Sequence, residues 1–274
     1  MATINTNAGA MVALQNLNQT NRDMEQVQSR INTGLAVASA KDNGGVYAIA
    51  QKMRSDVNGY AAVGNSLDLA ASTTDVALAA GEAIGDILIE MKEKALAASD
   101  SSLDTASRTA LNEDFKALRD QISTIVDNAE FNGTNLINNS VTSISALANA
   151  DGSNTITISD QNFSLGGGNV TVAAAASFAS AGDASTLVTT IETSLDNLNA
   201  SLAKLGTASS SLEIHKGFVG KLSDALEKGI GNLVDADLAK ESARLQSLQV
   251  KQQLGVQALS IANSAPSTIL GYFR

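Results

Sequence analysis

Apolar residues alternate at spacings of three and four along three stretches of the chain. The first stretch covers residues 57–98, and every position that recurs at this spacing is uncharged. The second follows the cap-forming residues 101–104, and the third covers residues 191–226. Such spacing is typical of helices that bury one stripe against their neighbours, so it predicts three long helices with a common seam. The main seam residues are Leu67, Ile84, Leu88, Met91, Leu111, Phe115, Leu118, Ile122, Leu198, Leu202 and Leu205.

The two ends of the chain each carry a thin apolar stripe among Asn and Gln residues. Helices with narrow stripes gain most of their stability from packing, so both ends need a partner. They can pair with each other, with other subunits, or with both. We therefore expect these stripes to drive polymerisation. The stripe residues are Leu14, Leu17, Met24, Val27, Ile31 and Leu35 at the first end, and Leu238, Leu245, Leu248, Val256, Leu259, Ile269 and Leu270 at the other.

Between residues 131 and 183 the sequence changes to Asn, Gly, Ser, Thr and Ala. Residues 155–159 and 170–172 alternate in polarity on either side of a cluster of three glycines at 166–168. This pattern predicts one or two short β-hairpins. Roughly fifty residues is close to the lower limit for an independent core, so we expect a surface excursion from the helical body.

Composition supports a mostly α fold, an elongated antiparallel helical bundle or coiled coil with a small β-hairpin excursion. The chain has 274 residues, of which 44% are hydrophobic and 3% aromatic, with one Pro and no Cys. Disulfides and thiolate metal sites are therefore excluded. The formal net charge of -10 disfavours nucleic acids and anionic membranes as partners.

Targeting signals are absent from the sequence. The first cation is Arg22, which does not fit a secretory signal peptide, and no apolar run reaches 18 residues. We expect either a cytosolic protein or one exported without a cleaved signal.

Catalytic chemistry has little support. His215 is the one histidine, with no cysteine or second histidine for a metal site or a catalytic dyad. Gly220 and Lys221 precede Leu222, where a phosphate-binding loop needs Ser or Thr. We therefore expect no enzyme activity, no cofactor and no metal.

Several segments resemble the bacterial flagellins. They are SRINTGL at residues 29–35, SAKD at 39–42, AIA at 48–50, EFNGTNL at 130–136 and the terminal block at 232–274. These segments cover both outer thirds of the chain in the order found in that family. The resemblance is to a short flagellin that has the two inner layers, D0 and D1, and little or no outer domain.

The resemblance implies a structural subunit that self-assembles into the flagellar filament, a helical homopolymer used for swimming. Residues 1–43 and 232–274 would form a terminal coiled-coil layer like D0. Residues 44–137 and 182–231 would form a helical body like D1, and residues 138–181 a short variable surface segment.

The resemblance also implies partners and a location. An export chaperone, hook-associated proteins and a cap protein are expected, with export through the flagellar type III apparatus to an extracellular filament. Glu90 stands where flagellins that activate the animal Toll-like receptor carry a key arginine, and Lys94 stands where they carry a leucine. This departure implies weak receptor activation.

Two other functions share some of these features. A hook–filament junction protein has similar terminal signatures, and a monomeric helical adaptor has a similar coiled-coil pattern. Electron microscopy of concentrated protein distinguishes them, since only a flagellin forms long tubes.

Overall fold

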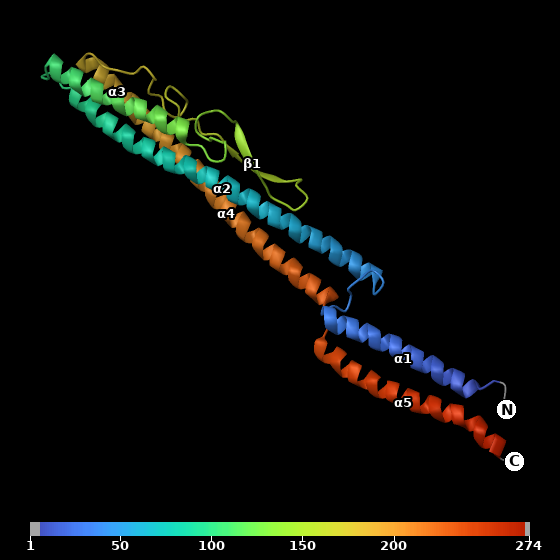
Figure 1. Ribbon diagram of the computed structural model, residues 1–274. Helices are drawn as coiled ribbons and strands as arrows, with labels where there is room; N and C mark the ends of the chain where they lie inside the picture. The colour runs from blue at the N-terminus through green and yellow to red at the C-terminus, as the bar shows by residue number, and fades with distance from the viewer. Residues whose placement is uncertain (1–5, 272–274) are drawn as a thin grey trace. The chain divides into compact units, whose positions relative to one another are not determined.

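The computed structural model describes the backbone of residues 6–271 and the side chains of residues 6–264 (Figure 1). The described chain is mostly helical and has one small antiparallel sheet, which confirms the predicted fold class. Its elements are α1 (Ala8–Thr33), α2 (Gly44–Ala98), α3 (Thr105–Asn128), β1 (Ser143–Leu147), β2 (Thr155–Ser159), α4 (Ala181–Val234) and α5 (Leu238–Gly271).

The chain divides into two compact units. Unit 1 consists of Met1–Ser55 and Ala225–Arg274, and unit 2 of Asp56–Asp224. Unit 2 contains most of α2 and α4, all of α3 and both strands, and unit 1 contains α1 and α5.

The core of unit 2 lies along the seam of α2. Small seam residues allow neighbouring side chains to approach the helix closely. A Cβ atom added to Gly81 would lie 2.6 Å from Leu202 Cδ2 and 2.9 Å from Phe163 Cε2. Glycine weakens a helix interior by about 1 kcal/mol relative to alanine, and here the close packing offsets that cost. The fully buried seam side chains include Leu67, Ile84, Leu88, Met91, Phe115, Ile122, Leu198 and Leu205.

Polar side chains set both ends of α3. The Asp104 carboxylate accepts a hydrogen bond from the Ser107 backbone N–H at 2.9 Å and so caps the first turn. After the helix, Asn132 and Gly133 have positive φ angles of 50° and 80°, which form a tight turn. Asn135 then donates to the Val126 carbonyl oxygen at 2.7 Å, which ties the turn to the last part of the helix.

The β-hairpin differs from the sequence prediction in its strand partners. Strand β2 at residues 155–159 was expected, but it pairs with β1 at residues 143–147 and not with residues 170–172. Val170 and Val172 are fully buried. Between them, the backbone N–H of Thr171 donates a hydrogen bond to Ser194 Oγ of α4 at 3.0 Å. The alternation at residues 170–172 therefore arises from packing on a helix, without a neighbouring strand.

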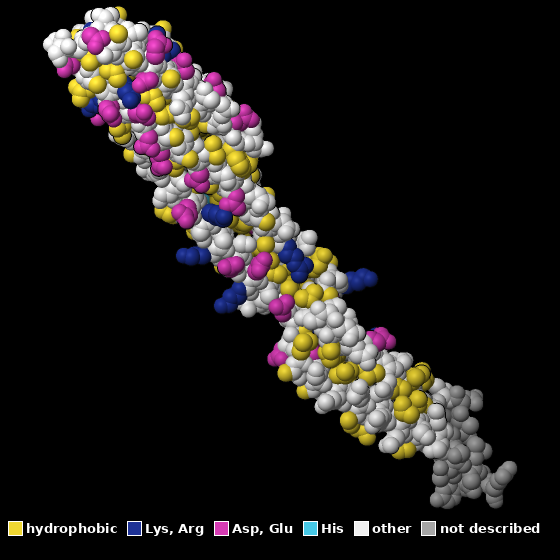
Figure 2. All heavy atoms as spheres, turned by 60° about the vertical axis from the view of Figure 1, so that its left-hand side comes forward, with side chains coloured by type: hydrophobic (Ala, Val, Ile, Leu, Met, Phe, Trp, Pro, Cys, Tyr) yellow, Lys and Arg dark blue, Asp and Glu magenta, His cyan; other side chains and the backbone are white. Residues whose placement is uncertain are grey.

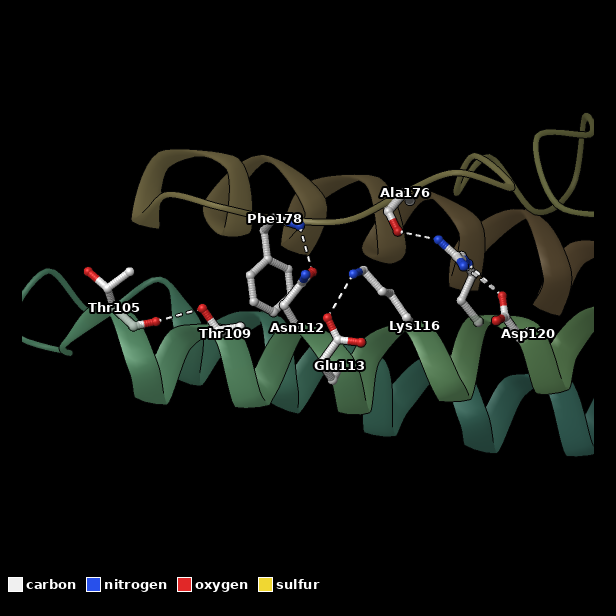
Figure 3. A network of polar contacts seen from close by, with 9 residues as sticks. Thr105, Thr109, Asn112, Glu113, Lys116, Asp120, Ala176 and Phe178 are labelled. Atoms are coloured by element: carbon white, nitrogen blue, oxygen red, sulfur yellow. Dashed lines mark hydrogen bonds and ion pairs between the residues drawn. The ribbon is translucent and has the colours of Figure 1, made fainter.

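The segment between the hairpin and α4 packs closely on the helices. Figure 3 shows this segment lying over α3, where Asn112 Oδ1 accepts a hydrogen bond from the Phe178 backbone N–H at 2.8 Å. Arg119 of the same helix donates to the Ala176 carbonyl oxygen at 2.8 Å. The rings of Phe178 and Phe115 meet edge to face, with centroids 5.4 Å apart. This segment therefore contributes large side chains to the core, which its Ser-, Gly- and Ala-rich composition did not indicate.

Unit 1 is an antiparallel pair of helices, α1 and α5. The Asn7 side chain caps α1 by accepting a hydrogen bond from the Ala10 backbone N–H at 3.0 Å. Gly34 ends the helix in the left-handed conformation, with φ at 72°, and its N–H donates to the Arg30 carbonyl oxygen. A short bridge between Leu35 and Asp235 then ties together the chain segments that lead out of α1 and into α5.

Candidate assembly surfaces

Three polar contacts set the register of α1 against α5. Asn7 donates to the Ala262 carbonyl oxygen at 2.6 Å, and Gln252 donates to Asn21 Oδ1 at 2.8 Å. At the other end of the pair, Arg30 Nη1 lies 3.1 Å from Glu241 Oε1. These contacts are distributed along the helices, so a shift of either helix would break all of them.

The Arg30–Glu241 ion pair is largely buried. The exposed fractions of the two side chains are 24% and 10%. Glu241 lies in the first turn of α5, where the helix dipole favours a negative charge. Loss of one partner would leave the other charge poorly solvated, so the pair favours this one register.

Most of the predicted polymerisation residues are buried or half-buried within the chain. Val27 and Leu248 are buried, with 1% and 5% exposed. Three members of the stripes are exposed, and the side chains of Ile269 and Leu270 lie outside the described residues. The half-buried members are Leu17, Met24, Ile31, Leu35, Leu245 and Leu259, and the exposed ones are Leu14, Leu238 and Val256.

A further set of apolar side chains points away from the helix pair. Of these residues Met11, Val12, Val250, Leu254 and Ile261 are each more than half exposed. The polymerisation residues predicted from the sequence do not include Val12, Val250, Leu254 or Ile261. The signal was the presence of apolar residues on all sides of α5, which a search for one stripe overlooks. Contiguous exposed apolar surface is characteristic of protein–protein interaction sites.

The outer half of the helix pair also lacks charged side chains. Residues 6–21 and 252–271 contain no Asp, Glu, Lys or Arg. The chain as a whole has a formal net charge of -10. Copies that meet through this half would therefore experience little direct repulsion there, and the exposed side chains could be buried without desolvating an ion.

The motif Ser39–Asp42 has a structural role in the connector that follows α1. The backbone N–H and the hydroxyl of Ser39 donate to Asp42 Oδ2 at 2.9 and 3.0 Å. These bonds stabilise the carboxylate and hold the pKa of Asp42 below its ordinary value. The motif therefore closes a compact turn before α2 begins.

The body seam residues share one core in unit 2. Those of α2 and most of those of α3 and α4 are buried, and Leu111, Leu118 and Leu202 are half-buried beside them. In contrast, Glu90 is exposed on α2, and Lys94 Nζ lies 3.8 Å from Asp114 Oδ2 on α3. Glu90 therefore lies outside the core, and Lys94 is half-buried between α2 and α3.

Reactive chemistry is not concentrated anywhere in the described residues. Within residues 6–264, no three His, Asp or Glu side chains come together as a metal site would require. His215 Nε2 lies 2.7 Å from the Ala148 carbonyl oxygen, which fastens the hairpin to α4. Within the described range, every helix is too short or too polar to cross a bilayer.

Comparisons with known proteins identify the family. The model of the bacterial flagellin N-terminal helical region matches residues 4–142, and that of the C-terminal helical region matches residues 188–273. Flagellin FljM of Caulobacter vibrioides is 55% identical over 271 residues, which cover 99% of this chain and 98% of FljM. A flagellin of Brucella melitensis is 39% identical over the full length of both chains.

A crystal structure of Bacillus cereus flagellin aligns with a TM-score of 0.48 and 24% identity, covering 55% of this chain and 86% of that one. The two family models together match well over half of the chain, and they cover α1, α2, α3, α5 and most of α4. The chain belongs to the bacterial flagellin family.

Proposed function

We propose that this structural subunit of the flagellar filament polymerises through the α1–α5 pair. The observation that supports this most directly is the outward apolar set of Met11, Val12, Val250, Leu254 and Ile261 on a helix pair whose outer half carries no charge. The inward stripe holds the pair together, and the outward set binds neighbouring copies.

Assembly and folding of the ends are coupled in this proposal. Among the described residues the α1–α5 pair has one buried apolar residue on each helix, Val27 and Leu248, so the pair buries little apolar surface by itself. The contacts with neighbouring copies supply the remaining burial. We therefore expect the ends to be weakly protected in the free subunit and stable in the filament.

We assign the layers of the subunit accordingly. Residues 1–43 and 232–274 form the terminal layer, residues 44–137 and 182–231 form the helical body, and residues 138–181 form a segment that faces solvent in the filament. The bridge between Leu35 and Asp235 and the turn at Ser39–Asp42 support a boundary near residues 34–43 and 232–237.

The proposal includes export, partners and the absence of catalysis. The subunit travels unfolded through the flagellar type III apparatus to the cell exterior, with an export chaperone, and meets hook-associated and cap proteins there. The lack of cysteine supports this route, because an unfolded chain without thiols forms no cross-links.

Weak activation of the flagellin-sensing Toll-like receptor is a further part of the proposal. Glu90 places a negative charge on the exposed surface of α2, and Asp114 engages Lys94. A receptor site that pairs with an arginine would meet like charge at Glu90.

Sedimentation and electron microscopy test the polymerisation mechanism. The full chain should form long tubes, whereas chains lacking residues 1–30 or residues 245–274 should stay in the supernatant. Circular dichroism provides the control, because the remaining body should keep its helical signal. Normal filaments from either truncated chain would contradict the mechanism.

A further inference from the structure

Helices α2 and α4 each carry a second, outward-facing stripe in unit 2. On α2 the stripe follows spacings of four and three, and its two large apolar members, Ile89 and Leu96, are each 59% exposed. On α4 the two large apolar members, Ile214 and Phe218, are 72% and 55% exposed. We call the first the acidic patch, formed by Glu82, Asp86, Ile89, Glu93 and Leu96, and the second the basic patch, formed by Lys204, Thr207, Ser211, Ile214, Phe218 and Lys221.

Both patches have the spacing of a helix–helix seam, but no helix of the described part of the chain covers them. All their members are exposed, whereas the buried seam of each helix lies on its opposite side. A hollow beside Ile214 is lined by small side chains, including Ala203, Gly206 and Ser210. An apolar ridge beside such a hollow can receive the side chains of another helix.

The charges of the two patches are opposite. The acidic patch has three carboxylates and no cation, and the basic patch has two lysines and no carboxylate. Among the residues that the structure describes, no ion pair involves any of these five charged side chains. Figure 2 shows Asp and Glu side chains concentrated over the end of unit 2 where α2 joins α3. A chain with a formal net charge of -10 repels its copies in general, so this basic patch is a favourable place for a copy to bind.

The two patches lie at different levels of unit 2. The ion pair of Lys216 with Asp68 places the Ile214–Phe218 part of the basic patch beside the part of α2 near residue 68, whereas the contact of Leu202 with Gly81 places its Lys204 end near residue 81. Ile89 is about 30 Å beyond residue 68 along α2 at the rise of an α-helix. A contact between two different surfaces is heterologous, so it does not close a dimer, and it propagates into an open helical polymer where the rotation between copies does not close a ring.

We propose that the acidic patch of one copy binds the basic patch of the next copy in the filament. This proposal rests on the proposed function, and it adds a contact in the body of the subunit to the contacts of the α1–α5 pair. Ile89 and Leu96 become buried beside Ile214 and Phe218, and the carboxylates and lysines at the margins pair across the contact.

Charge reversal tests the proposal in the full-length chain. Glu93→Lys and Lys221→Glu should each raise the critical concentration for assembly about fivefold to tenfold, measured by sedimentation. The double variant should return to within about twofold of the unmodified chain because each contact regains opposite charges. A mixture of the two single variants should also assemble, since alternating copies restore the pairing.

A matched control separates this contact from a general effect of charge. Asp127→Lys changes the net charge equally at an exposed position of α3 outside both patches. It should leave the critical concentration within about twofold of the unmodified value, and circular dichroism should show the same helicity in every variant. Equal effects of Asp127→Lys and Glu93→Lys, or no rescue in the double variant, would overturn the proposal.

Cross-linking tests the heterologous geometry. The chain has no cysteine, so a Leu96→Cys, Phe218→Cys double variant offers two defined thiols. In filaments, a flexible bis-maleimide should convert this variant into a ladder of covalent oligomers, whereas each single variant should remain monomeric. Dimers from the single variants, or no ladder from the double variant, would contradict the contact.

Filaments that form without the ladder would leave the proposed function intact. An unmodified chain that forms no filaments would overturn both the proposed function and the contact between the patches.

Discussion

Gly81 of α2 lies so close to Leu202 of α4 that a side chain at residue 81 would force Leu202 to shift. A Cβ atom at residue 81 would stand 2.6 Å from Leu202 Cδ2, and Phe163 closes the same space from the middle segment. Three parts of the chain that are far apart in sequence therefore meet at one glycine.

Gly81→Ala should destabilise the subunit by about 1–2 kcal/mol, because overpacking outweighs the gain in helix propensity. Urea denaturation followed by circular dichroism measures the change. Gly64→Ala is the matched control on the same helix, since a Cβ there meets no atom within 4 Å. The control should be neutral or stabilising by up to about 1 kcal/mol. A stabilised Gly81→Ala variant would show that Leu202 and Phe163 rearrange freely.

Glu241→Ala should weaken the α1–α5 pair by up to about 3 kcal/mol, because Arg30 would lose its partner in a largely buried position. Hydrogen exchange should then accelerate at the amides around Val27 and Leu248. Arg244→Ala, an exposed change on the same helix, should leave exchange rates unaltered. The double variant Arg30→Met, Glu241→Leu should recover much of the protection, since it removes both charges. Unchanged exchange in Glu241→Ala would indicate that the ion pair contributes nothing to the pairing.

The Asp104 cap predicts a pH-dependent stability. Hydrogen bonds from the backbone N–H and the hydroxyl of Ser107 hold the pKa of Asp104 below its ordinary value of 3.8. Because the pKa is lower in the folded state, the stabilisation is complete above the unfolded value and is lost as the pH falls through the folded value. Asp104→Ala should therefore lower the unfolding midpoint at pH 7, and the deficit should shrink below pH 3.8. Asp104→Asn, which keeps a capping oxygen, should retain stability without this pH dependence. A deficit that stays constant down to pH 2 would contradict the assignment.

Insertions should be tolerated very differently at two glycines of the middle segment. Gly152 lies in the exposed β1–β2 turn, where φ is 72°. A Cβ at Gly167 would lie 2.8 Å from the Ser164 carbonyl oxygen, and the neighbouring Gly166 donates to the Val172 carbonyl oxygen. A Gly-Ser insertion after Gly152 should preserve both helicity and filaments, whereas the same insertion after Gly167 should lower thermal stability. Equal tolerance at both sites would show that the packing around Val172 is not required.

Receptor activation should increase when Glu90→Arg is combined with Lys94→Leu. The first change replaces a repelled charge with a bidentate donor, and the second removes the ion pair with Asp114. Reporter cells that carry the receptor measure the response, with Glu82→Arg on the same helix as the control. Strong activation by the unmodified chain would refute the prediction of a weak agonist.

The sequence by itself determined the helices and the family. The spacing of Leu67, Ile84, Leu88 and Met91 identifies one face of α2, because a helix repeats its faces every three to four residues whatever lies opposite. The same local rule identified α3 and α4, and the SAKD and EFNGTNL segments identified the resemblance to flagellins. These features depend on neighbours along the chain, so they can be predicted without a partner.

Only the tertiary structure decided which partner each pattern takes. Residues 170–172 and 155–159 alternate alike, yet one segment packs on α4 and the other forms a strand, because alternation records burial on one side and not the element that causes it. Likewise Val27 and Leu248 are buried within the chain, whereas the side chains of Leu254 and Ile261 are exposed. A helix that is apolar on several sides contains no local signal for which side meets its own chain, since that choice depends on the energy of the whole fold.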